Sequence, residues 1–473
     1  MMKTDAKSVR VRFAPSPTGY LHIGSLRTAL FNWLFARHHK GTFLVRIEDT
    51  DIERSKSEYT DAIIHDLKWM DLQSDEPLVI QSHRFAEHAK LIEHLMAQGK
   101  AYKDYYSQEE LIELYKQKTG ISEFVKAYAV CRDQPQDQDK PYVVRFKLPL
   151  DRHSVSFNDL IRGTLSFEIE QLDDFVIARS DGRPMYNFVV VADDIHQRVT
   201  HVIRGEDHIS NTPKQILLYE ALEKEQPIFA HLPLILGKEG QRLSKRDAAT
   251  ATQEYRDLGY LPDALLNYLV RLGWSHGDQE IFSREELINL FSIEEVGKKG
   301  SIFDQEKLDW INGLYIRNSD NYALKKMLSD LRLDFGDSFF NESQIIELIN
   351  VYKDRSKTLV ELANHLKMFG QAPQDYDAIA CSEWVDSHTL SVLQDLVDKL
   401  NALASFALQD IKELLAVYAK EHNKKLGAIA QPIRIALVGG SSSPSVFELL
   451  AILGKKEALM RLERFVLFLQ QRS

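Results

Sequence analysis

The sequence predicts an α/β fold in which a doubly wound parallel sheet is interrupted by an α+β insertion and followed by an all-α C-terminal region. Three observations lead to this prediction. Apolar strand-like runs alternate with helical stretches at 9–70 and again at 199–236, which is typical of βαβ units. Between residues 77 and 185, short strand-like runs mix with helical ones. Beyond residue 247 the pattern is helical.

The first part of the sheet lies near the N-terminus. Residues 9–13 alternate between apolar and charged side chains, which predicts a strand. The apolar residues that follow have the spacing of a single buried stripe on a helix: Leu26, Ala29, Leu30, Trp33 and Leu34. The chain therefore begins with a predicted strand, a loop and a helix.

The loop within residues 12–25 is predicted to bind a nucleotide. Pro15 and Pro17 hold the chain extended, so that the free N–H groups at the start of the helix face a ligand. His22 can donate a hydrogen bond to a phosphate oxygen, and Gly24 has no side chain to keep a nucleotide away. The alternative is that His22 is a helix cap or a packed surface residue, because short motifs match by accident.

A second predicted strand, residues 42–47, ends in the acidic segment 48–51. Ligand groups collect at the carboxyl ends of strands in a doubly wound sheet, so Glu48 is a candidate for binding a ligand ammonium group. Asp49 and Asp51 are expected among the residues that cap the next helix, 57–70.

The stretch from 77 to 185 has the pattern of an insertion between the two halves of the sheet. Its predicted helices are 84–98 and 109–118, and its strand-like runs are 142–147, 164–170 and 175–179. The polar segment 133–140 is expected to be a surface loop without chemistry.

The parallel-sheet pattern returns with a strand at 199–204, a helix at 212–224 and a strand at 232–236. The loop that follows is basic and carries Lys238, Arg242, Lys245 and Arg246. Such a loop can bring positive charge to a leaving pyrophosphate in nucleotidyl transfer. The alternative, a solvated basic turn, is disfavoured by the predicted nucleotide loop in the same sheet.

The remainder of the chain is predicted to be helical, at 262–272, 284–291, 324–333, 344–366, 389–404, 408–421, 447–453 and 456–470. A length of 473 residues predicts two to four domains. The net charge is −10, from 59 Lys and Arg against 69 Asp and Glu. Any contact with RNA must therefore use local basic patches.

Two further absences limit the class of protein. Cys131 and Cys381 are far apart in sequence and form neither a disulfide framework nor a zinc-type cluster. The N-terminus lacks the apolar core of a secretion signal, and no apolar run approaches the length that spans a bilayer. A cytoplasmic location is therefore expected.

Two motifs point to a family. His22-Ile23-Gly24-Ser25 and Arg242-Leu243-Ser244-Lys245-Arg246 resemble the HIGH and KMSKS motifs of class I aminoacyl-tRNA synthetases. Their contexts, 12–51, 183–222 and 231–248, resemble bacterial glutamyl-tRNA synthetase, and the resemblance covers nearly the whole chain. It implies a Rossmann-type catalytic domain in two halves, an acceptor-end-binding insertion, a stem-contact helical domain and an α-helical anticodon-binding region. The corresponding ranges are 1–77 and 186–246, 78–185, 247–318 and 319–473.

The resemblance also implies a reaction and its residues. Glutamate and ATP, with Mg²⁺, would form glutamyl-adenylate, and the glutamyl group would pass to the 3′ end of glutamate tRNA; bound tRNA is expected to be needed for the first step. Catalytic roles fall to His22 and Lys245. The ATP-binding residues would be His22, Gly24, Ser25, Asp207, Ile235, Arg242, Ser244 and Lys245. The glutamate-binding residues would be Arg12, Ala14, Ser16, Glu48, Tyr186 and Arg204. A guanidinium fork matches a carboxylate better than an amide, which favours glutamate over glutamine.

One departure concerns zinc. Zinc-bearing relatives have cysteines where this chain has Asp104 and Tyr106, so we expect no structural zinc and no metal ligands in the chain.

Several alternatives stay open. Glutaminyl-tRNA synthetase shares the front half but carries β-barrel anticodon domains, and the glutamyl-queuosine-forming paralogue lacks an anticodon domain. A non-catalytic RNA-binding homologue would be expected to lose site residues that are present here. A monomer is expected, and whether glutamine tRNA is also charged is left open by the sequence.

Overall fold

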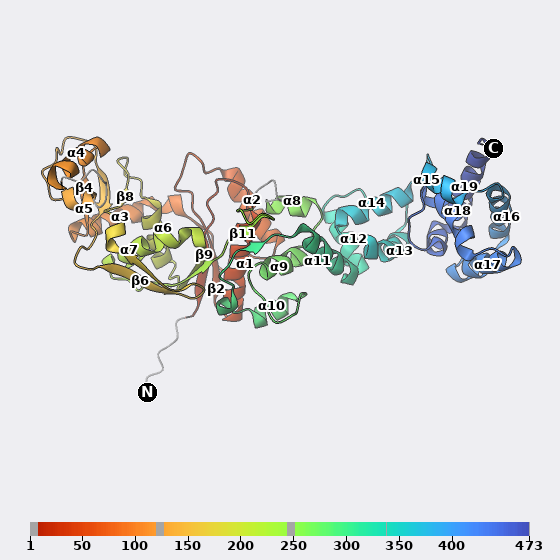
Figure 1. Cartoon of the computed structure of the whole chain (residues 1–473), viewed down its shortest axis with the longest axis horizontal. Coiled ribbons are helices and arrows are strands. Elements are labelled where there is room, and N and C mark those ends of the chain that lie inside the picture. The colour runs from red at the N-terminus through yellow and green to blue at the C-terminus, as the bar shows by residue number, and fades with distance from the viewer. Residues whose placement is uncertain (1–7, 120–126, 244–250, 337, 473) are drawn as a thin grey trace, which may run out of the picture. The chain divides into compact units, whose positions relative to one another are not determined.

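The computed structural model describes residues 8–119, 127–243, 251–336 and 338–472, which form two compact units (Figure 1). Unit 1 comprises Met1–Tyr255 and Leu265–Gln305, and unit 2 comprises Arg256–Ala264 and Glu306–Ser473. Among the described residues, no helix combines the length and the apolar character needed to cross a membrane.

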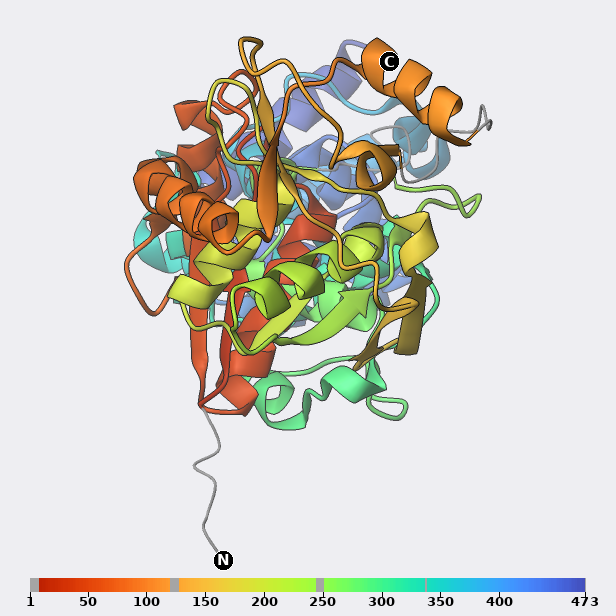
Figure 2. The same cartoon turned by 90° about the vertical axis from the view of Figure 1, so that its left-hand side faces the viewer.

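Unit 1 is organised around parallel strands (Figure 2). One sheet has the order β1 (Arg10–Phe13), β2 (Thr42–Ile47), β3 (Val79–Ile80). A second has the order β7 (Gly163–Glu168), β6 (Ser154–Asp159), β10 (Ile228–Leu232), β9 (His201–Gly205). Only the β6–β7 pair of these two sheets is antiparallel. Strands β1 and β9 lie side by side, and the N–H of Thr200 donates to the carbonyl of Arg10 at 2.9 Å. The predicted α/β class with a parallel sheet is confirmed.

Helices cover both faces of these strands. Helix α1 (Ile23–His38) binds β9 from one side, because the Asn32 amide donates to the carbonyl of Ile203 at 3.0 Å. Helices α6 (Tyr186–His196) and α7 (Thr212–Ala221) lie on the other side, where Arg204 of β9 donates to the hydroxyl of Thr212. Alternate residues of a strand face opposite ways, so the arginines of β1, β2 and β9 project toward α6 and α7.

The expectation of a single buried stripe on α1 is wrong. Eleven of its sixteen residues are buried, including Arg27 and Asn32. The helix packs on the sheet and also against α10 (Arg284–Leu290), so most of its circumference is covered. Polar side chains can be buried there because backbone carbonyls accept their hydrogen bonds.

The predicted strand at 232–236 is two strands in different sheets. Strand β10 ends at Leu232, and β11 (Ile235–Leu236) pairs instead with β12 (Ser301–Ile302). Pro233 has no N–H with which to continue the ladder. The N–H of Leu234 donates to the carboxylate of Glu206 at 2.9 Å.

The two acids after Glu48 do not cap the next helix, contrary to expectation. Helix α2 (Ser57–Trp69) begins after Lys56 and has no side-chain cap. Asp49 accepts a hydrogen bond from the N–H of Ser82 at 2.8 Å, and Asp51 pairs with Arg54. The intervening turn is too long for either acid to serve as the N-cap.

The middle of the chain contains α3 (Phe85–Ala97), α4 (Gln108–Thr119) and α5 (Ala127–Cys131), beside an antiparallel sheet of order β4 (Ala101–Asp104), β5 (Val143–Phe146), β8 (Val176–Ala178). Strand β6, within the stretch predicted as an insertion, was not foreseen and pairs with β10. Its side chains Val155 and Phe157 belong to the same core as those of α6, α7 and β9.

The C-terminal part of the chain is helical in its described residues, apart from β12. Its helices before α13 are α8 (Thr252–Asp257), α9 (Pro262–Arg271), α10, α11 (Gln305–Asn318) and α12 (Asn321–Asp330). The later ones are α13 (Glu342–Tyr352), α14 (Leu359–Gly370), α15 (Ala378–Trp384), α16 (Thr389–Ala402), α17 (Leu408–Glu421), α18 (Leu426–Val438) and α19 (Val446–Gln470). The all-α C-terminal region is confirmed.

The predicted single helix at 344–366 is two helices. Helix α13 ends at Tyr352, and Thr358 caps α14 by accepting a hydrogen bond from the N–H of Glu361. A threonine hydroxyl that satisfies a first-turn N–H favours a new helix start. The predicted pair at 447–453 and 456–470 forms α19, which is kinked at Gly454, where φ is +74°.

We expect His201 to make unit 1 less stable in mild acid. Its ring packs on Phe35 with centroids 4.9 Å apart, and burial, followed by the charge of His39, lowers the pKa of His201 to about 4. The unfolded chain, with its ordinary histidine pKa near 6.5, therefore binds more protons between pH 6.5 and 4. This contribution to stability is complete above pH 6.5 and is lost as the pH falls through that window.

Urea unfolding at pH 7 and pH 5 tests this expectation. Between these values the wild-type protein should lose about 1 kcal/mol more than His201→Gln, after allowance for the partial exposure of the ring. Equal losses in the two proteins would contradict the assignment to His201.

Candidate active site

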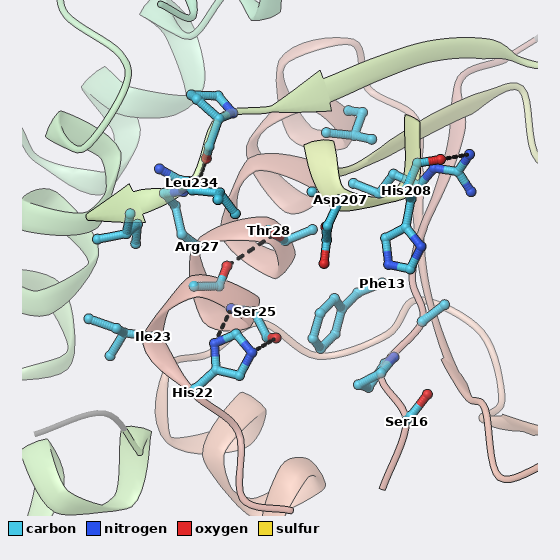
Figure 3. A pocket seen from close by; sticks show the side chains of 18 of the residues that line it. Phe13, Ser16, His22, Ile23, Ser25, Arg27, Thr28, Asp207, His208 and Leu234 are labelled. Atoms are coloured by element: carbon cyan, nitrogen blue, oxygen red, sulfur yellow. Dashed lines mark hydrogen bonds between the residues drawn. The ribbon is translucent and has the colours of Figure 1, made fainter. Parts of the chain in front are cut away.

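A cavity of about 520 Å³ opens in unit 1 where β1, β2, β9 and β10 end. Every predicted site residue that the structure describes lines it: Arg12, Ala14, Ser16, His22, Gly24, Ser25, Glu48, Tyr186, Arg204, Asp207, Ile235 and Arg242. Ser244 and Lys245 lie outside the described residues. Figure 3 shows His22 and Ser25 at one end of the cavity, and His208 and Ser16 away from them, beyond Phe13 and Asp207.

His22 is the N-cap of α1. Its backbone is extended, with φ −86° and ψ 155°, and its Nδ1 accepts a hydrogen bond from the N–H of Ser25 at 3.2 Å. Because Nδ1 is an acceptor, the neutral ring carries its proton on Nε2, which lies 3.0 Å from the Ser25 hydroxyl (Figure 3). Burial, and then the charge of Arg242, lowers the pKa of His22, so the ring is neutral at pH 7. Because Nδ1 serves as the cap, the hydrogen-bond donor that the ring offers beside the helix start is Nε2–H.

Gly24 keeps this helix start open. A Cβ atom built on Gly24 would lie 3.1 Å from Nδ1 and 3.2 Å from Cε1 of His22. Both contacts are tight, so a side chain at this position would displace the ring. Within the helix, the N–H groups of Ile23 and Gly24 have no acceptor, while the N–H of Ser25 is taken by the cap of His22.

Two arginines and two acids form a buried network beside the cavity, which Arg12 and Glu48 of the network line. Asp194 of α6 accepts from Nε of Arg12 at 3.0 Å and from Nη1 of Arg46 at 2.7 Å. Arg46 also donates to Glu48 at 3.0 Å. Burial by itself raises the pKa of Asp194, but Arg12 and Arg46 outweigh it and lower that pKa. For Glu48 burial outweighs the arginines, so its pKa is raised.

Arg204 differs from Arg12 and Arg46 because neutral groups, and not acids, accept its hydrogen bonds. It is buried, and its Nη2 donates to the Thr212 hydroxyl at 2.8 Å, while Nε donates to Nε2 of His231 at 3.1 Å. Nη1 is buried without a hydrogen-bond partner, and no carboxylate among the described residues pairs with this guanidinium. Burial lowers the pKa of Arg204, although a guanidinium stays charged at neutral pH. An unpaired buried cation beside a cavity is suited to bind an anionic ligand group.

Tyr186 and His208 form a neutral pair in the same wall. The Tyr186 hydroxyl lies 3.1 Å from Nδ1 of His208. Burial, followed by the charge of Glu48, raises the pKa of Tyr186 to about 12. Burial, followed by the charge of Arg204, lowers the pKa of His208 to about 4. Both side chains are therefore uncharged at pH 7 and offer hydrogen bonds without adding charge.

Asp207, Ile235 and Arg242 also line the cavity. Arg242 follows a turn at Gly240, where φ is +81°, and bridges back to Leu236. A Cβ atom at Gly205 would lie 2.5 Å from Oδ1 of Asp207, so the glycine leaves the space that this carboxylate occupies.

Several residues around the cavity were missed by the sequence analysis: Arg27, Thr28, Arg46, Asp194, His208 and His231. Arg46 and His231 interrupt apolar strands, and Asp194 ends an apolar helical run. A charged or titratable side chain within an apolar run is a signal that could have revealed them. The hydrogen-bond partners of these residues could not be predicted from the local pattern, because the partners lie on other elements.

Comparison with known proteins decides the family. Residues 8–310 match the profile described as "tRNA synthetases class I (E and Q), catalytic domain", and residues 322–466 match "Anticodon binding domain". The chain is 46% identical to the glutamate–tRNA ligase of Geobacter sulfurreducens over 98% of its own length and 99% of the relative. The chain belongs to the glutamate–tRNA ligase family.

Solved structures agree with this membership. The fold superposes on a glutamate tRNA ligase from Elizabethkingia meningosepticum, solved in complex with its amino acid, with a TM-score of 0.86 and 33% identity over 97% of this chain and 99% of that one. The corresponding values for the enzyme of Elizabethkingia anophelis are 0.83, 33%, 97% and 100%. The family resemblance predicted from the motifs is confirmed.

Asp104, which stands where zinc-bearing relatives have a cysteine, forms an ion pair in this protein. Asp104 accepts a hydrogen bond from Nε of Arg145 at 2.6 Å, and both side chains are buried. Among the described residues no group of three or more His, Cys, Asp or Glu could hold a metal ion. That this protein lacks zinc stays a prediction.

Proposed function

We propose that this protein is a glutamate–tRNA ligase that activates L-glutamate with ATP and transfers it to the 3′ end of glutamate tRNA. One observation carries the proposal. A single cavity joins Arg204, a buried arginine with no carboxylate partner in the described part of the chain, to a helix start at which His22 presents Nε2–H. A carboxylate receptor and a phosphate receptor within one cavity match the two substrates of adenylate formation.

The arginine end would bind glutamate. Arg204, Arg12 and Tyr186 would hold the side-chain carboxylate, and the amide of glutamine would leave part of their charge unpaired. Glu48 would bind the α-ammonium group, and Ala14 and Ser16 would line the pocket. The Glu48 carboxylate lines the cavity while it is held by Arg46 at 3.0 Å, which supports this orientation.

The helix end would bind ATP. An α-carboxylate oxygen of glutamate would attack the α-phosphorus, and the bond to the pyrophosphate oxygen would break. The developing negative charge would be stabilised by His22 and Arg242, with Gly24, Ser25, Asp207 and Ile235 bordering the nucleotide. Ser244 and Lys245 have the same role by resemblance alone. Mg²⁺ would supply charge neutralisation and would enter on the ATP phosphates, since Asp207 and Glu48 are the carboxylates that line the cavity among the described residues.

The rest of the chain would bind tRNA. The anticodon-binding profile covers residues 322–466, which supports an anticodon-binding role for the proposed domain 319–473. We also propose an acceptor-end role for 78–185, a stem-contact role for 247–318 and catalytic halves at 1–77 and 186–246. A cytoplasmic monomer is the form that we propose.

Pyrophosphate exchange tests the proposed function. We expect exchange with glutamate in the presence of purified glutamate tRNA and none with glutamine. Exchange that is supported by glutamine, or by glutamate without any tRNA, would contradict the proposal. Charging of purified glutamine tRNA in the same experiment would instead identify a non-discriminating form.

A further inference from the structure

Asp159 and His231 form a fully buried pair behind Arg204. They stand on the adjacent parallel strands β6 and β10, whose register places Phe229 opposite Asp159. Nδ1 of His231 lies 2.6 Å from Oδ2 of Asp159, and neither side chain is exposed. Neither residue lines the cavity, but His231 contacts Arg204, which does.

The hydrogen bonds determine which ring nitrogen carries the proton. Asp159 is held in place because its Oδ1 accepts from the N–H groups of Ile161 at 3.0 Å and Arg162 at 2.8 Å. Its Oδ2 faces Nδ1 of His231, so Nδ1 carries the proton. Nε2 is then an acceptor, and it accepts a hydrogen bond from Nε of Arg204 at 3.1 Å.

This arrangement orients Arg204 without neutralising it. Its hydrogen bonds go to the imidazole of His231, the hydroxyl of Thr212 and the backbone carbonyl of His208, which are all neutral groups. Burial lowers the pKa of His231 despite the hydrogen bond to Asp159, which keeps the ring neutral. The carboxylate of Asp159 therefore acts on Arg204 only through the ring.

We propose that Asp159 and His231 are positioning residues that hold Arg204 in the orientation that binds the side-chain carboxylate of the amino acid. This inference rests on the proposed role of Arg204. If the pair were replaced by an acid in direct contact, the guanidinium would be paired within the protein and less available to a ligand. With the pair in place, Nη1 has no hydrogen-bond partner among the residues that the structure describes.

Two variants at one position separate positioning from general support of the fold. In His231→Gln the amide oxygen can occupy the place of Nε2 and accept from Arg204. In His231→Asn the shorter amide reaches only the Asp159 side and leaves Nε of Arg204 without its acceptor. His153→Gln is the matched control, because His153 is an exposed histidine immediately before β6.

We measure the KM values for glutamate and ATP and kcat in tRNA-dependent pyrophosphate exchange, together with the thermal midpoint. His231→Asn should raise the KM for glutamate about ten- to hundredfold, since it removes a hydrogen bond to a charged group, with kcat and the KM for ATP within about twofold. His231→Gln should stay within about threefold of the wild-type protein. Asp159→Asn should resemble His231→Asn. The ring can then carry its proton on Nε2, which faces Arg204 and would no longer accept a hydrogen bond from it.

The outcomes are distinguishable. An unchanged KM for glutamate in His231→Asn, or equal rises in the two KM values with a lower thermal midpoint in both His231 variants, would overturn the positioning role. Should His231→Asn not fold, His231→Gln and Asp159→Asn decide the question by the same comparison. A wild-type protein that shows no glutamate-dependent exchange with glutamate tRNA would overturn the proposed function itself.

Discussion

Arg204→Gln is expected to lower kcat/KM for glutamate in tRNA-dependent pyrophosphate exchange by about a thousandfold. The variant removes a buried cation that has no carboxylate partner among the described residues and whose Nη1 has no hydrogen-bond partner. A glutamine amide cannot supply the charge or the fork that a carboxylate requires. Exchange measured over a range of glutamate concentrations gives the value.

Two comparisons make this prediction specific. Arg204→Lys keeps the charge but loses the planar fork, so it should fall between the wild-type protein and Arg204→Gln. Arg183→Gln, which breaks a surface pair with Asp181, should leave kcat/KM unchanged. A loss in Arg204→Gln no greater than in Arg183→Gln would remove Arg204 from the site.

Arg46→Met is expected to destabilise the protein by about 3–5 kcal/mol, the cost typical of breaking a buried ion pair from one side. Arg46 is fully buried between Asp194 at 2.7 Å and Glu48 at 3.0 Å. Without it, Glu48 has lost its charged hydrogen-bond donor, and Asp194 retains only Arg12. Urea unfolding at pH 7, followed by a fluorescence or circular-dichroism signal, measures the change.

The control is the same substitution at an arginine whose ion pair is exposed. Arg54→Met breaks the contact with Asp51 at the surface, and we expect little change in the free energy of unfolding. The double variant Arg46→Met with Asp194→Leu should recover part of the loss, because it also removes a buried acid. Equal effects of Arg46→Met and Arg54→Met would contradict the importance of the network.

Much of the site could be predicted because it is built from strand ends. Arg12, Glu48, Arg204 and Ile235 come from separate parts of the chain, yet all lie near strand ends. Arg12 and Arg204 lie one residue before the ends of β1 and β9, Glu48 follows β2, and Ile235 begins β11 shortly after β10 ends. Parallel strands with crossover helices bring their carboxyl ends to one edge. The local pattern singled out Glu48 as a ligand-binding candidate at a strand end, and the family resemblance supplied Arg12, Arg204 and Ile235.

Errors arose where a partner distant in sequence determined the local structure. Pro233 ends β10, but β11 exists because the chain finds a second partner at Ser301. Strand β6 belongs to the sheet because β10 accepts it, and its own residues alternate as in any hairpin strand. Helix α1 is buried on most sides because other elements cover its polar face.

By itself, the sequence determined the α/β class, the helical C-terminal region and the family, and the resemblance to that family supplied many of the residues that line the cavity. The fold class follows from periodicity and the family from motifs, which both act over a few residues. Tertiary structure alone decided how the charges are paired. Asp194 meets Arg46 across 148 positions of the chain, and Asp159 meets His231 across 72. Whether a buried arginine is neutralised or left available to a ligand depends on such distant contacts, since an unpaired charge in the interior is governed by what surrounds it.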